Sequence, residues 1–130
     1  MRGPAFGDSP LARDGVPARR TPAERFDQVA LRIMQAVVSR WTEQLGDVEL
    51  AVEEVPVLPL TWGTSTVPLS SYVEPAGSRR PRLVLFRRPI EHRAENLTEL
   101  EALLVTVIVE QLAEVLGLPV EDVLPGYEED

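Results

Sequence analysis

Apolar residues recur every three or four positions over the first long patterned stretch of the chain. Thr21 can cap a helix, Pro22 suits the first helical position, and Glu24 can complete a capping box. Gly46 follows the last apolar residue and suits a left-handed helix stop. The pattern therefore predicts one amphipathic helix over residues 22–45, with an apolar stripe made of Phe26, Val29, Ala30, Ile33, Met34, Val37, Val38, Trp41 and Leu45.

A second helix is predicted over residues 97–116, where apolar side chains cover more than half of the helical circumference. Asn96 followed by Glu99 marks its start, and Gly117 followed by Pro119 marks its end. Such a helix must be buried on several sides. Its narrow polar arc contains Glu99, Thr106, Glu110 and Glu114, while Gln111 lies within the apolar arc and needs a polar partner or a cleft.

Between the helices, residues 48–55 and 82–87 have the composition of strands. Residues 56–80 are rich in Pro, Gly, Ser and Thr, which predicts mostly loop with two short strands near residues 60–62 and 67–72. Because Pro89 follows it closely, we expect the strand at 82–87 to lie at a sheet edge or to end there. Residues 119–124 can form one further helical turn.

This order of elements predicts an α+β fold of one small domain. Two long helices would pack on one face of a short mixed sheet of three or four strands. The domain would span residues 21–127, preceded by a disordered arm at residues 1–20 and followed by an acidic tail at residues 128–130.

Composition removes several classes of function. The chain has no cysteine and one histidine, His92, which excludes thiolate metal sites and any site with two imidazoles of this chain. A net charge of −8 disfavours nucleic acid as a partner. Nothing indicates a membrane span or a secretory signal, so the expected compartment is the cytoplasm. Charge is segregated, since all the basic residues are Arg and six of them lie between positions 79 and 93.

Residues 107–117 read Val-Ile-Val-Glu-Gln-Leu-Ala-Glu-Val-Leu-Gly and resemble the active helix of the minimal zincin-like metallopeptidases, a family of small bacterial proteins. The order of elements resembles that family as well, with strand-like segments at residues 52–56 and 85–91. The resemblance extends over about residues 22–127 and implies a zincin-like fold. In that family the helix carries H-E-x-x-H-x-x-G, which binds zinc through two His and uses Glu as the general base.

Alignment on Gly117 puts Glu110 and Glu114 at the two His positions and Gln111 at the position of the general base. Val120 falls near the third ligand, with Glu121 as a further carboxylate beside it. A shift by one residue would restore a catalytic Glu but would put apolar residues at both ligand positions, so we reject it. The resemblance therefore implies the fold, but not peptidase activity.

Three hypotheses about function remain at this stage. The first is an inactive family member that binds a protein or a peptide, with Arg82 and Arg87 on the edge strand favouring acidic segments. The second is a metal-dependent hydrolase with a carboxylate site at Glu110 and Glu114, for which Mg²⁺, Mn²⁺ or Ca²⁺ would be better suited than zinc. The third is an anion-binding or nucleic-acid-binding site at the arginines. We expect no cofactor. For Glu110 and Glu114 we expect a solvated helix face in preference to the cation site, and we expect His92 at the surface.

Overall fold

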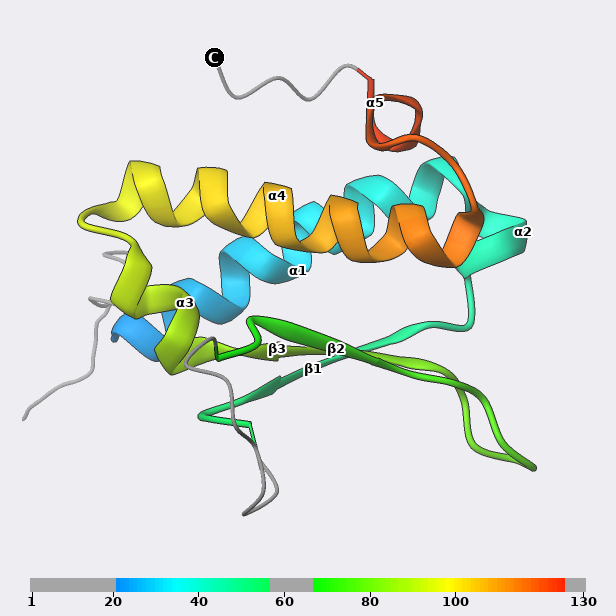
Figure 1. The fold of residues 1–130 in the computed structure, drawn as a ribbon, viewed down its shortest axis with the longest axis horizontal. Helices are drawn as coiled ribbons and strands as arrows, with labels where there is room; N and C mark the ends of the chain where they lie inside the picture. Colours follow the sequence, from blue (N-terminus) through cyan, green and yellow to red (C-terminus); the bar gives the residue numbers. More distant parts are fainter. Residues whose placement is uncertain (1–20, 57–66, 126–130) are drawn as a thin grey trace, which may run out of the picture.

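The computed structural model describes residues 21–56 and 67–125, and this part of the chain forms five helices and one three-stranded mixed sheet (Figure 1). The predicted α+β class is confirmed. The strand expected near residues 60–62, the arm at 1–20 and the tail at 128–130 lie outside the described residues. The elements are α1 Pro22–Arg40, α2 Thr42–Leu45, β1 Glu49–Glu53, β2 Ser70–Val73, β3 Arg82–Phe86, α3 Arg87–Arg93, α4 Leu97–Leu116 and α5 Val120–Val123.

Helix α1 begins as predicted but ends earlier. The Thr21 hydroxyl accepts a hydrogen bond from the Glu24 amide at 3.1 Å, and the Glu24 carboxylate accepts one from the Thr21 amide at 3.0 Å. The helix breaks at Trp41, whose backbone leaves the helical region and whose indole N–H donates to the Val123 carbonyl at 2.8 Å. The predicted left-handed stop at Gly46 is wrong, because its φ is −63°. Trp41 therefore ties the end of α1 to α5.

Helix α4 has the bounds that the sequence predicts. The Asn96 side chain accepts a hydrogen bond from the Glu99 amide at 2.9 Å, and Gly117 ends the helix with a φ of 70°. The side chains of Leu104 and Ile108 are fully buried. The short turn of helix expected after Pro119 is also present, as α5.

The sheet has the order β1-β3-β2, with β3 parallel to β1 and antiparallel to β2. The expectation that the strand at residues 82–87 is an edge strand is wrong, because β3 is the central strand. Four consecutive residues of β3 are buried, as befits a strand with a neighbour on each side: Leu83, Val84, Leu85 and Phe86. Among the described strands, β1 and β2 form the two edges of the sheet.

The chain turns directly from β3 into α3, so the strand expected to continue through residue 91 ends at Phe86. Of the two interpretations of Pro89, the strand end is confirmed and the sheet edge is wrong. Pro89 lies in the first turn of α3, where its missing N–H is not needed. The Arg87 side chain pairs with Glu54 at 2.5 Å, which fixes α3 to the end of β1, and with Glu91 of α3 itself at 2.9 Å.

Both long helices cover the same face of the sheet, with α4 in front of α1 in the view of Figure 1. Helix α1 contacts β1 and helix α4 contacts β2. Leu83 and Leu85 point into the core between the sheet and these helices. Within the described residues, no helix combines the length and the apolarity that crossing a membrane would require.

Candidate functional site

The residues singled out on α4 lie on one side of the helix, toward its C-terminal half. At about 100° per residue, Glu114 falls between Glu110 and Gln111 around the helix axis. Both carboxylates are exposed, whereas Gln111 is half-buried. The helix thus presents two adjacent carboxylates to solvent and one amide toward the protein.

Gln111 has the polar partner that its place in the apolar arc requires. Its Oε1 accepts a hydrogen bond of 2.9 Å from the Ser70 hydroxyl on β2. Ser70 pairs with Leu85 in the sheet register and therefore lies on the helix-covered face. The sequence does not single out Ser70, because only the strand order brings it beneath α4. The bond joins the candidate helix to an edge strand.

Within residues 21–56 and 67–125, β2 has a strand on one side only, and its other edge carries main-chain groups directed outward. The Leu69 carbonyl accepts a hydrogen bond of 3.0 Å from the Phe86 amide. Main-chain groups in an antiparallel pair alternate between facing the partner and facing away. By this alternation the main-chain groups of Ser71 and Val73 bond to β3, whereas the N–H and C=O groups of Ser70 and Tyr72 point away from the sheet.

The Tyr72 side chain on the same strand stays protonated more readily than a free tyrosine. Burial raises the pKa of its hydroxyl, and the nearby Glu74 carboxylate raises it further.

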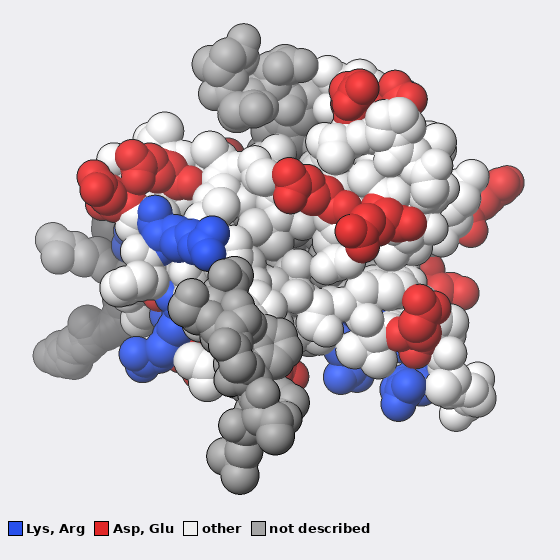
Figure 2. Space-filling view, in the orientation of Figure 1, with Lys and Arg blue, Asp and Glu red and all other residues white. Residues whose placement is uncertain are grey.

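The surroundings of α4 are acidic. Glu121, the further carboxylate expected near the motif, is exposed on α5 together with Asp122. Figure 2 shows acidic side chains along α4 and around α5, whereas the basic side chains on this face lie toward α3 and the hairpin between β2 and β3. Across residues 21–56 and 67–125, no group of three or more His, Cys, Asp and Glu residues is placed to hold a metal ion.

The arginines expected on an edge strand lie elsewhere. Arg82 is on the central strand, where its guanidinium lies 3.5 Å from the Glu49 carboxylate of β1. Arg87 is the first residue of α3, and its guanidinium is engaged by two carboxylates. The structure therefore does not bring these arginines to the free edge of β2. His92 lies on α3, away from the motif residues, and is exposed as expected.

One family of known proteins matches most of the chain. The family described as zincin-like metallopeptidase matches residues 34–126, which include α4 and its neighbours up to α5. No curated protein matches the chain.

Proposed function

This chain belongs to the zincin-like metallopeptidase family, and we propose that it binds an extended peptide or protein segment beside α4 and does not cleave it with zinc. The observation that carries this proposal is the hydrogen bond between Gln111 and Ser70. The resemblance aligns Gln111 with the family's general base. A neutral amide cannot take a proton from water near neutral pH, and here its oxygen bonds to the strand below.

The residues aligned with the zinc ligands do not fit zinc. Catalytic zinc in proteins is held by three ligands, of which at least one is commonly histidine. The two positions on α4 are the carboxylates Glu110 and Glu114, both exposed, and the one histidine of the chain lies on α3. We therefore assign no hydrolytic step to this site.

The free edge of β2 supports binding without a metal. The outward N–H and C=O groups of Ser70 and Tyr72 can pair with an added strand, which derives its affinity from main-chain hydrogen bonds. The edge lies beside α4, since Gln111 contacts Ser70. A peptide paired with β2 would therefore run past the carboxylates of Glu110 and Glu114.

These carboxylates favour a basic peptide. The sequence suggests a preference for acidic segments, but that preference depends on arginines which lie on the central strand and on α3. Near the β2 edge the exposed charges on α4 are Glu110 and Glu114. An exposed ion pair contributes about 0.2–1 kcal/mol, so each carboxylate should change affinity by roughly 1.4- to 5-fold.

Fluorescence anisotropy with two labelled peptides tests this proposal. The probes are acetyl-Val-Arg-Val-Arg-Val-amide and the same peptide with Glu in place of Arg. We expect the arginine peptide to bind more tightly, and the double variant Glu110→Gln/Glu114→Gln to weaken its binding. The control Glu43→Gln/Asp47→Asn removes the same charge from exposed positions at and after α2 and should have little effect.

Equal binding of the two peptides, or equal loss of binding in both double variants, would count against the site beside α4.

Elemental analysis of the purified protein tests the alternative function, that of a metal-dependent hydrolase. A carboxylate cation site at Glu110 and Glu114 predicts close to one equivalent of Mg²⁺, Mn²⁺ or Ca²⁺, lost in the Glu110→Gln/Glu114→Gln variant.

A further inference from the structure

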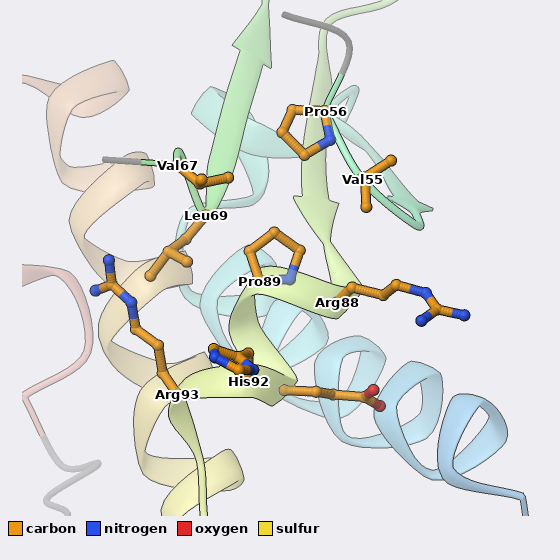
Figure 3. Close-up of a pocket in the computed structure, with 9 residues that line it drawn as sticks. Val55, Pro56, Val67, Leu69, Arg88, Pro89, His92 and Arg93 are labelled. Atoms are coloured by element: carbon orange, nitrogen blue, oxygen red, sulfur yellow. The ribbon is translucent and has the colours of Figure 1, made fainter. Parts of the chain in front are cut away.

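A separate cavity of about 770 Å³ lies at the end of the sheet against α3 (Figure 3). No described residue of α4 lines it, and neither does any residue of β2 itself, so it is distinct from the site proposed above. Its volume lies within the range of pockets that bind small molecules.

One side of this cavity is apolar and exposed. Val55 follows β1, and Val67 and Leu69 precede β2. Val55 is 52% exposed and Val67 is 39% exposed, which places both among the exposed large apolar side chains of the described residues. Such a surface gains free energy when an apolar group covers it.

The other side of the cavity is basic, although the protein as a whole is acidic. Arg88, His92 and Arg93 of α3 line it. Arg88 pairs with Glu54 at 3.1 Å, but Arg87 uses the same carboxylate. In Figure 3 the Arg93 side chain extends alongside Leu69. Among the described residues, Arg93 forms no ion pair with a carboxylate.

The carboxylates near the cavity are already committed. Glu91 lines the cavity as well, but its carboxylate accepts a hydrogen bond from Arg87 at 2.9 Å. Glu54 and Glu91 are paired with Arg87 and Arg88, whereas Arg93 forms no ion pair among the described residues. The excess positive charge lies next to the exposed valines, so the cavity combines an apolar side with a cationic side.

We propose that this cavity binds a carboxylate attached to an apolar group, with the apolar group against Val55, Val67 and Leu69 and the carboxylate at Arg93. A neutral apolar ligand would leave Arg93 unpaired. A small polar anion would leave the valines exposed. A molecule that carries both features satisfies both sides of the cavity at once.

Titration followed by two-dimensional ¹H–¹⁵N NMR tests the proposal, with sodium octanoate as the probe and acetate and octanol as controls. We expect saturable octanoate shifts centred on Leu69, His92 and Arg93, weaker binding of octanol, and no comparable shifts with acetate. Equal responses to octanoate and acetate, or octanoate shifts that map elsewhere, would overturn the proposal.

Two variants test whether octanoate binds specifically at this cavity or adsorbs non-specifically to the protein surface. Arg93→Gln should lower the affinity for octanoate by about 1.4- to 5-fold, the range expected for one exposed ion pair. Arg80→Gln removes the same charge elsewhere and is the control, so it should leave the affinity nearly unchanged. Val67→Ser should also weaken octanoate and should leave the fold intact, because Val67 is already exposed. Unchanged affinity in both Arg93→Gln and Val67→Ser would refute the site.

A carboxylate attached to an apolar group occurs both in free apolar acids and at the C-terminal ends of peptides. A peptide that ends in leucine distinguishes these two sources when it is compared with octanoate. The same peptide with an amidated C-terminus is the control, because it lacks the carboxylate. Tighter binding of the free-carboxylate peptide than of octanoate would identify a chain end as the ligand, whereas tighter octanoate binding would identify a free acid. If neither carboxylate ligand binds, the proposal fails, whether or not the β2 edge binds a peptide.

Discussion

At the residue scale, Gln111 and Ser70 determine what α4 can do. A side chain of α4 that sits above an edge strand can activate water, hold a metal or support the strand. Here the amide oxygen of Gln111 accepts the Ser70 hydroxyl at 2.9 Å, which is a supporting contact. The need for a polar partner could be predicted from the place of Gln111 in the apolar arc. The identity of that partner could not, because it depends on strand order.

Gln111→Glu should therefore not produce a zinc enzyme. A carboxylate restores a possible base, but the flanking positions Glu110 and Glu114 still supply no imidazole. We expect elemental analysis after incubation with zinc to show far less than one equivalent, and casein to remain uncleaved.

The triple variant Glu110→His/Gln111→Glu/Glu114→His is the positive control for this experiment. It places two imidazoles one turn apart on one helix face and should retain more zinc than Gln111→Glu. Zinc near one equivalent in Gln111→Glu, or casein cleavage that a chelator stops, would contradict our account of the site.

At the element scale, local signals predicted α4 completely and the region after β3 poorly. Both ends of α4 are set by side chains next to them in sequence, the cap at Asn96 and the left-handed Gly117. The turn from β3 into α3 depends instead on Arg87, which pairs with Glu54, 33 residues earlier in the chain. A pattern in neighbouring residues cannot predict a contact between residues so far apart in the chain.

The buried face of α4 should dominate the stability of the fold. Ile108 is fully buried in the core, and truncating a buried Ile to Ala costs about 2–5 kcal/mol. We expect Ile108→Ala to lower the free energy of unfolding in urea by that amount, and Thr106→Ala, at an exposed position of the same helix, to change it little. Similar losses in both variants would contradict the burial of this face.

The link between β1 and α3 should depend on pH. Hydrogen bonds from Arg87 and Arg88 lower the pKa of the Glu54 carboxyl below its ordinary value of 4.5. The folded state therefore binds fewer protons than the unfolded state, and the carboxylate stabilises the fold above that ordinary value. This stabilisation is lost as the pH falls through the lowered pKa.

Glu54→Gln should accordingly melt at a lower temperature than the wild type at neutral pH, and the difference should disappear in acid. Glu53→Gln is the control, because the Glu53 carboxylate forms no ion pair among the described residues. A difference between Glu54→Gln and wild type that stays constant from neutral to acid pH would show that the Arg87–Glu54 pair does not stabilise the link.

At the scale of the whole molecule, the packing of the helices on the sheet could be predicted from the sequence, but the identity of the edge strands could not. Two helices with broad apolar faces require a sheet to cover, and the structure places both on one face. Nothing local in the sequence shows that β3 lies between β1 and β2. The β2 edge therefore became a candidate binding site only once the strand order was known.

The segregation of charge follows the same layers. The acidic side chains of α4 and α5 lie on the face shown in Figure 2, and the arginines of α3 lie at the end of the sheet. The two proposed sites thus differ in sign, with a basic peptide expected at the β2 edge and a carboxylate at the α3 cavity. Ligands of opposite charge should consequently act at different places on this one small domain.

Amide hydrogen exchange of β2, resolved by residue with NMR, tests the peptide site most directly. In the free protein the outward amides of Ser70 and Tyr72 should exchange rapidly, while those of Ser71 and Val73, which bond to β3, should be protected. Saturating acetyl-Val-Arg-Val-Arg-Val-amide should slow exchange at Ser70 and Tyr72 and leave Ser71 and Val73 nearly unchanged. Unaltered exchange at Ser70 and Tyr72 with the peptide bound would contradict binding at the β2 edge.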